Sequence, residues 1–198
     1  SFGEGDSNIT TANSIQRGFG YSVRCVSTTE NPKPDPESMP ANNEIWYTPN
    51  QEGTTFDPNI QATFGEGVTM ISNEYIEDIG YGIITFDKEI TTIGYMAFNN
   101  SQKKIKSMIL PNSVQSIESN AFSGHLQSIN IPDSVTAIQD SAFSGTALQN
   151  VTIPESVESI GVGAFRDCSK LSSVTILSDK ITSLADQVFL NCPMLSSI

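Results

Sequence analysis

Apolar and polar positions recur in a fixed order from Ile90 to the C-terminus of this chain. Each period opens with two aliphatic residues three positions apart, followed five positions later by phenylalanine or its equivalent. The five copies are I-T-T-I-G-Y-M-A-F (90–98), V-Q-S-I-E-S-N-A-F (114–122), V-T-A-I-Q-D-S-A-F (135–143), V-E-S-I-G-V-G-A-F (157–165) and I-T-S-L-A-D-Q-V-F (181–189). Successive copies start 21 to 24 residues apart, so the pattern indicates a repeat architecture.

A second phrase follows each copy of the first: I-K-S-M-I-L-P (105–111), L-Q-S-I-N-I-P (126–132), L-Q-N-V-T-I-P (148–154), L-S-S-V-T-I-L (171–177) and the truncated L-S-S-I (195–198). Its alternation predicts a short strand in which Ile129 and Ile131 point to one side. Ser128 and Asn130 then point to the other side. The proline after three of the strands ends them, because proline cannot donate to a ladder. The tract G-I-I-T-F-D (82–87) matches the end of this phrase and predicts an incomplete leading coil.

A unit of about 22 residues is too short to enclose a core, so each coil must stack on its neighbours. Stacked coils pair their strands in parallel, about 4.8 Å apart. Equivalent side chains then form two interior columns, one of Ile117, Ile138, Ile160 and Leu184, and a phenylalanine spine of Phe98, Phe122, Phe143, Phe165 and Phe189. Poor helix propensity predicts turns and short 3₁₀ pieces between strands. We therefore predict a right-handed, β-rich solenoid with short parallel strands and few or short helices.

The charge balance excludes several classes of protein. The 198 residues carry 22 acidic and 10 basic side chains, a net charge of −12, which argues against nucleic acid and anionic membranes as partners. Fourteen of the acidic residues lie in 1–89, so the first part of the chain differs in kind from the repeats. No apolar run approaches the roughly 20 residues of a membrane-spanning helix. One histidine, His125, excludes any site that needs two, and three cysteines cannot form a closed disulfide framework.

The repeat, I/V-x-x-I-G-x-x-A-F-x-x-C-x-x-L-x-x-I-x-I-P-x-S, resembles the BspA-like (Treponema pallidum type) leucine-rich repeat over residues 82–198. The resemblance implies a leucine-rich-repeat solenoid. It also implies a secreted or surface protein of a gut Bacteroidetes bacterium such as Bacteroides, anchored in the outer membrane of a Gram-negative cell, with adhesion in host–microbe interaction as its role. The match departs from the family in two places. The motif's cysteine is present only at Cys168 and Cys192, and the repeat at 114–134 is one or two residues short around His125.

Composition and resemblance together divide the chain into four parts. Residues 1–30, which include G-F-G-Y-S-V-R-C-V (18–26), are expected to be the tail of an upstream module or an N-terminal extension. The proline-rich stretch 31–43 predicts an extended linker. Residues 44–89 resemble the leader of such surface proteins and predict an N-terminal cap over the first coil, and 90–198 hold about five repeats, the last truncated. The aromatic side chains available to the cap are Trp46, Tyr47, Phe56, Phe64 and Tyr75.

Candidate chemistry in the sequence is sparse. His125 lies in a turn, S-G-H-L, with no nucleophile motif around it. The segment D-S-N-I-T (6–10) lacks the glycine and terminal glutamate of a calcium loop, and F-G-E-G-V (64–68) lacks the lysine of a phosphate loop. The acids of the repeats are expected at solvent-facing turns: Asp133, Asp140, Glu155 and Glu158. We therefore predict no enzymatic activity and no catalytic, cofactor-binding or metal-binding residues.

Cys168 and Cys192 lie one repeat apart, so stacked coils place them about 5 Å from each other. That separation permits a disulfide. Two inward thiols in one column are favoured instead, because the motif's cysteine packs inward in the family and behaves as a small hydrophobic residue. Cys25 is expected to be a free thiol.

The outer side of the strands is the remaining candidate for function. Its polar, nearly uncharged columns supply eight candidate ligand contacts: Ser107, Ile109, Ser128, Asn130, Asn150, Thr152, Ser173 and Thr175. Repeat proteins commonly bind partners on such a face, so we predict a protein ligand from the host matrix or a bacterial surface. Three alternatives stay open. The columns only keep the sheet soluble, the chain is a structural spacer presenting another module, or a glycan stacks on cap aromatics such as Trp46.

Overall fold

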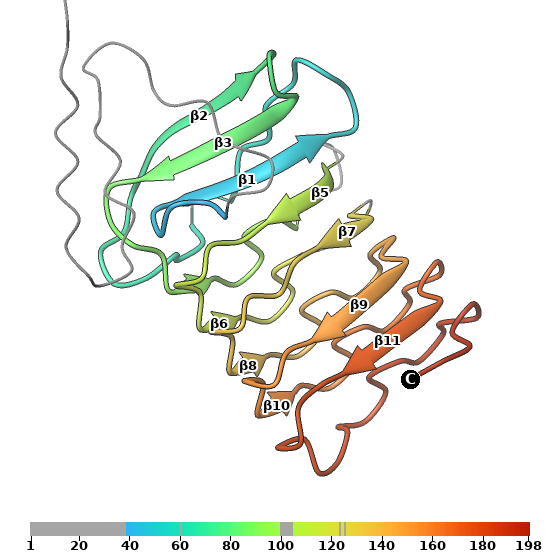
Figure 1. The fold of residues 1–198 in the computed structure, drawn as a ribbon. Coiled ribbons are helices and arrows are strands. Elements are labelled where there is room, and N and C mark those ends of the chain that lie inside the picture. The colour runs from blue at the N-terminus through green and yellow to red at the C-terminus, as the bar shows by residue number, and fades with distance from the viewer. Residues whose placement is uncertain (1–38, 60, 100–104, 123, 125) are drawn as a thin grey trace, which may run out of the picture. The chain divides into compact units, whose positions relative to one another are not determined.

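The computed structural model describes residues 39–59, 61–99, 105–122, 124 and 126–198, all within one compact unit, Lys33–Ile198. These residues form strands and turns, with no helix among them. The strands (Figure 1) are β1 (Glu44–Pro49), β2 (Met70–Ile76), β3 (Tyr81–Phe86), β4 (Thr92–Ile93), β5 (Ile105–Ile109), β6 (Ser116–Ile117), β7 (Ser128–Ile129), β8 (Ala137–Ile138), β9 (Asn150–Ile153), β10 (Ser159–Ile160) and β11 (Ser173–Ile176).

The repeats wind as coils that carry a strand on each of two sides (Figure 1). On one side β4, β6, β8 and β10 form a parallel sheet in which Ile117 pairs with Ile138, and Ile138 with Ile160. On the other side β5 pairs in parallel with β7, and β9 with β11. Equivalent residues of adjacent repeats are therefore neighbours in space. This confirms the predicted leucine-rich-repeat solenoid of short parallel strands.

The phenylalanine spine is confirmed. It runs through Phe98, Phe122, Phe143, Phe165 and Phe189, and each successive pair of rings is stacked. The ring centroids of Phe122 and Phe143 lie 5.1 Å apart at an interplanar angle of 2°. The rings keep this alignment because the backbone is bonded in the same register. The N–H of Phe143, for example, donates to the carbonyl of Ala164 at 2.8 Å.

The spine continues into the first part of the chain. The rings of Phe56 and Phe64 lie 5.9 Å and 6.1 Å from that of Phe98, measured between centroids. Phe64 also contacts Phe86 at 4.6 Å. The aromatic residues before the repeats therefore cover the first ring of the spine, as a cap must do for the apolar end of a solenoid.

A serine column that the sequence analysis did not single out ties the coils together. The hydroxyl of Ser134 donates to the carbonyl of Val114 at 2.6 Å, and that of Ser156 to Val135 at 2.7 Å. Ser178 donates in the same way to Val157 at 2.5 Å. Ser134 and Ser156 are the final serine of the repeat motif, I-P-x-S, and Ser178, two positions after Ile176, makes the equivalent bond. Each one satisfies a backbone carbonyl of the preceding coil, which would otherwise be left without a partner at a turn.

The aliphatic column is confirmed except at its last member. The side chains of Ile117, Ile138 and Ile160 are buried, with at most 6% of their surface exposed. Leu184 was expected to join them, and this was wrong, because 43% of its surface is exposed. Among the described residues β10 is the last strand of this sheet, so nothing packs on the far side of Leu184.

The antiparallel part of the sheet contains an inserted strand. β3 was expected to be a leading coil beside β5, and it does run in the same direction as β5. However, β1 lies between them and pairs antiparallel with both, in the order β2-β3-β1-β5-β7. The repeat-like sequence of β3 therefore joins the same sheet as β5 but pairs with β1 rather than with β5.

Some expectations lie outside the described residues. These are the proposed N-terminal module at 1–30 with Cys25, most of the linker at 31–43, and the turn residue His125.

Candidate functional site

The spacing of the buried residues decides which side chains face outward. In the coil that contains β7, Leu126 and Ile131 are buried and Ile129 is packed against the core. Two consecutive residues, Gln127 and Ser128, therefore lie outside the core between Leu126 and Ile129. A simple alternation predicts only the second of them.

The outward side chains line up across the coils because the backbone ladder continues from coil to coil. The N–H of Gln127 donates to the carbonyl of Lys106 at 2.9 Å, and that of Gln149 to Gln127 at 3.4 Å. Ser172 donates to Gln149 at 2.8 Å, and Ser196 to Ser172 at 3.1 Å. We call the outward side chains of residues 105–109, 126–130, 148–153, 171–176 and 195–198 the outer face.

A shallow groove of about 270 Å³ lies on the outer face across three coils. It is lined by two neighbouring columns of side chains: Lys106, Gln127 and Gln149 in one, and Ser107, Ser128 and Asn150 in the other. Three of the predicted contacts, Ser107, Ser128 and Asn150, therefore meet at this groove. The column of Lys106, Gln127 and Gln149 was missed. The spacing L-x-x-I of the second phrase could have predicted it. The two inward residues are three positions apart, so both residues between them face outward.

Two of the predicted contacts have other partners. The side-chain amide of Asn130 is bonded to the backbone of Leu110: its Oδ1 accepts from the N–H at 2.7 Å and its Nδ2 donates to the carbonyl at 3.1 Å. β7 ends at Ile129, so this amide takes the place of the next rung of the ladder. Ile109 is half-buried and lies opposite Trp46 of β1.

The remaining predicted contacts flank the groove. Thr152 and Thr175 are exposed and paired in register on β9 and β11. Ser173 is half-buried beside Asn150 in the same ladder.

Hydrogen bonds within the groove hold part of its lining in place. The hydroxyls of Ser107 and Thr48 lie 2.5 Å apart, and Oδ1 of Asn150 accepts from the hydroxyl of Ser172 at 3.3 Å. Among the described residues, the side chains of Lys106, Gln127 and Gln149 have no such partner. They are the groups that a ligand can engage without breaking a bond in the protein.

Charge is distributed unevenly around the coils. On the outer face Lys106 is the single charged side chain among the described residues. Four acids of the repeats are exposed as expected: Asp133, Asp140 and Glu155 on turns, and Glu158 directly before β10. An acidic protein therefore presents one face with neutral side chains and a single cation.

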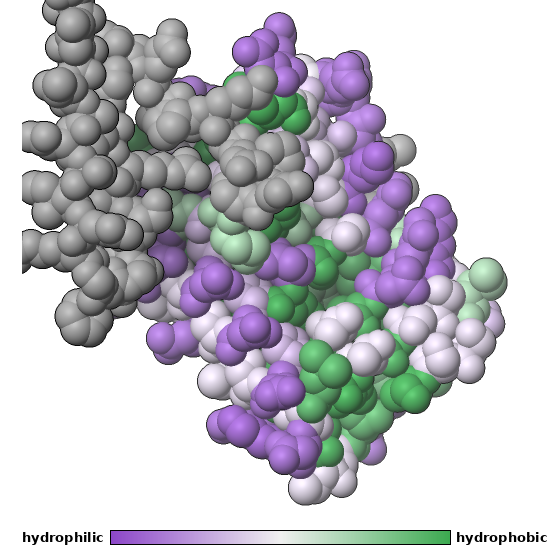
Figure 2. Space-filling view, in the orientation of Figure 1, coloured by the Kyte–Doolittle hydropathy of each residue, from purple (hydrophilic) through white to green (hydrophobic). Residues whose placement is uncertain are grey.

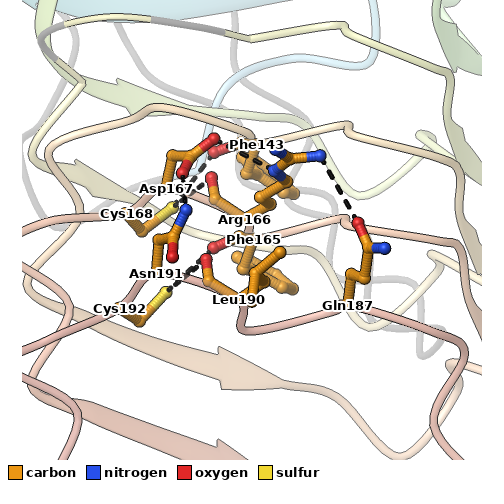
Figure 3. Close-up of polar contacts among 9 residues, drawn as sticks. All are labelled: Phe143, Phe165, Arg166, Asp167, Cys168, Gln187, Leu190, Asn191 and Cys192. Carbon is orange, nitrogen blue, oxygen red and sulfur yellow. Dashed lines mark hydrogen bonds and ion pairs between the residues drawn. The ribbon is translucent and has the colours of Figure 1, made fainter.

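The cysteines form an interior column rather than a reactive site. The thiol of Cys168 donates to the carbonyl of Phe143 at 3.2 Å, and that of Cys192 to Phe165 at 3.1 Å (Figure 3). Both are free thiols, so the disulfide alternative is not formed. Burial raises the pKa of Cys168 to about 11 and also raises that of Cys192. Thr146 occupies the same place one coil earlier and donates to the carbonyl of its own Phe143 at 2.9 Å.

The cap does not offer Trp46 as a sugar platform. Only 4% of its surface is exposed. Its indole N–H donates to the carboxylate of Glu44 at 2.9 Å, and its ring centroid lies 6.4 Å from that of Tyr81. A stacking sugar needs an open ring face, which this arrangement lacks.

Fold and face together define a leucine-rich-repeat protein of the β-solenoid kind. The family model for the BspA type leucine rich repeat region matches in 6 copies, over residues 58–104 and 91–198. This match spans more than half of the chain, which therefore belongs to that family. A search of curated proteins found no match.

Three solved structures are similar over part of their length. A leucine rich cell surface protein from Faecalibacterium prausnitzii is 35% identical with a TM-score of 0.35, over 46% of this chain and 21% of the other. The pneumococcal vaccine antigen PcpA is 25% identical with a TM-score of 0.44, over 49% and 26%. A leucine-rich repeat protein from Bacteroides ovatus is 30% identical with a TM-score of 0.42, over 56% and 35%. The chain thus spans about a fifth to a third of the length of these proteins.

No helix in the described part of the chain has the length and apolar character needed to cross a bilayer. Within the same residues, no three His, Cys, Asp or Glu side chains gather where they could share a metal ion.

Proposed function

We propose that this chain is a non-catalytic module of a cell-surface or secreted protein, and that it binds a protein of the host matrix or of a bacterial surface through the outer face. The observation that carries the proposal is the groove of Lys106, Gln127 and Gln149 on a nearly uncharged face of a strongly acidic protein. Net charge keeps most of the surface solvated and repels other acidic proteins. The outer face is the part of the repeats where that repulsion is weakest.

The proposed location rests on the family. BspA-like proteins are typically surface proteins, and we include anchoring in a Gram-negative outer membrane in the proposal. The glycan-binding alternative is not supported by the buried Trp46. The spacer alternative predicts instead that the outer face has no partner of its own.

A binding panel tests the proposal. The purified chain is measured against immobilised matrix proteins, bacterial surface proteins and glycans, beside a face variant with Ser128→Glu and Asn150→Glu. A matched control carries Gln115→Glu and Ser159→Glu, two exposed residues at the opposite sheet. Saturable binding to a protein that the face variant loses and the control keeps supports the proposal. Absence of binding across the panel, or equal binding by both variants, contradicts it and favours the spacer.

A further inference from the structure

We infer that the groove on the outer face takes an extended peptide segment of its partner, with an acidic residue placed against Lys106. This inference rests on the proposed function and names the kind of partner. The lining of the groove consists of two glutamines, an asparagine, two serines and one lysine.

The size of the groove limits what it can hold. It crosses three coils, and two steps between strands of about 4.8 Å give a length of about 10 Å. An extended chain rises about 3.3 Å per residue, so about three residues fit along it. A helix with its side chains is about 10–12 Å wide and would need a wider trough. The volume of about 270 Å³ likewise suits a few residues rather than a folded domain.

The chemistry of the lining favours a peptide. Gln127 and Gln149 each carry an amide donor and an amide acceptor on adjacent coils. A peptide group has the same donor and acceptor pair, so these side chains can bond a backbone without reading its sequence. The lining has no apolar side chain to receive an apolar anchor, and no aromatic ring on which a sugar could stack.

Charge complementarity selects the acidic residue. The ammonium of Lys106 is exposed, and no described side chain forms an ion pair with it. It also ends the densest basic stretch of the sequence, K-K-I-K (103–106), in a chain of net charge −12. A carboxylate beside Lys106 therefore gains attraction at the one position of the outer face that carries positive charge.

The test is an NMR titration of the ¹⁵N-labelled full chain with a pentapeptide of glycine and serine around a central glutamate. The same peptide with a central glutamine is the matched probe. We expect saturable shifts at the side-chain amides of Gln127 and Gln149 that are weaker with the glutamine peptide. Lys106→Gln should weaken binding of the glutamate peptide about two- to fivefold, as expected for an exposed ion pair, and Lys106→Glu should weaken it further. Lys170→Gln, an exposed lysine outside the groove, should leave it unchanged.

Equal affinity for the two peptides, equal effects of Lys106→Gln and Lys170→Gln, or shifts confined to other residues would overturn the inference. These outcomes separate it from the proposed function. A protein partner from the binding panel that is lost in the face variant but bound equally by wild type and Lys106→Glu leaves the proposed function standing and removes the acidic peptide.

Discussion

The phenol ring of Tyr47 lies directly over Gly82, in the space that a β-carbon at that position would need. The hydroxyl of Tyr47 accepts from the N–H of Phe56 at 2.9 Å and donates to Oδ1 of Asn73 at 2.8 Å. One buried ring on β1 therefore contacts β3 and bonds both β2 and the segment around Phe56. This contact secures the antiparallel strands that cover the first coil.

Replacing Gly82 by alanine should destabilise the chain by about 1–3 kcal/mol, because the added methyl group must displace the ring of Tyr47 and its two hydrogen bonds. Urea unfolding followed by circular dichroism measures the free energy. Ser72→Ala, in the neighbouring strand β2, serves as the control and should cost less. A Gly82→Ala protein as stable as this control would show that the ring can move aside freely.

Truncating the spine should cost more in the middle than at its last ring. Phe143 is fully buried between two stacked rings, whereas Phe189 is half-buried and stacks on Phe165 alone among the described residues. Phe143→Ala should therefore lower the free energy of unfolding by about 3–5 kcal/mol, and Phe189→Ala by clearly less. Calorimetry of the two variants gives the comparison. Equal losses would contradict a spine in which each inner ring is covered on both sides.

The amide of Asn130 should matter for stability rather than for binding. Asn130→Ala leaves the N–H and the carbonyl of Leu110 without their partners, and we expect a loss of about 1–3 kcal/mol. Thr152→Ala is the matched control, since Thr152 holds the equivalent outward place on β9, is exposed and has no side-chain bond within the described residues. Its effect should stay within about 0.5 kcal/mol. Chemical denaturation of both variants decides the point, and a neutral Asn130→Ala would refute it.

Alkaline pH should weaken the folded state through Cys168. Burial raises its pKa to about 11 from the ordinary value of 9.0, so the folded chain holds the thiol proton more tightly than the unfolded chain does. The resulting stability is fully present below pH 9 and is lost as the pH rises toward 11.

The measurement is the free energy of unfolding at about pH 8 and about pH 10.5, in wild type and in Cys168→Ala. The decline between the two pH values should be smaller in Cys168→Ala. Tyr47, whose pKa burial also raises, contributes to the decline in both proteins and cancels in the comparison. Parallel declines would mean that the thiol titrates alike in the folded and unfolded chain.

The last described coil shows why the repeat pattern predicts burial correctly inside the stack but not at its final coil. Figure 2 shows hydrophobic residues at the surface around the last coil. Leu177, Met194 and Ile198 are exposed by 53%, 60% and 69%. Ile198 holds the position that the buried Val151 and Val174 hold in earlier coils, so the sequence marks it as buried. Burial in a solenoid needs a neighbouring coil, and this is a property of the stack rather than of the residue.

The sequence by itself determined the stacking unit and the phenylalanine spine, while the family resemblance implied the inward packing of the cysteines. The first two follow from one physical condition, which is that equivalent residues of identical coils become neighbours when the coils stack. The turn before each phenylalanine shows how strong that condition is. Met96, Asn120 and Ser141 all adopt positive φ, between 54° and 55°, although none is a glycine, because the register of the stack imposes the same turn on every coil.

Only the tertiary structure decided the features that depend on segments far apart in the chain. β1 is inserted between β3 and β5 because its backbone finds ladder partners on strands tens of residues away, which a periodic pattern does not encode. β7 ends at Ile129, so no further strand bond reaches the N–H and the carbonyl of Leu110. The side-chain amide of Asn130 bonds both groups instead. The groove of Lys106, Gln127 and Gln149 and the column beside them exists only once three coils are stacked, because each coil supplies two consecutive outward residues to it.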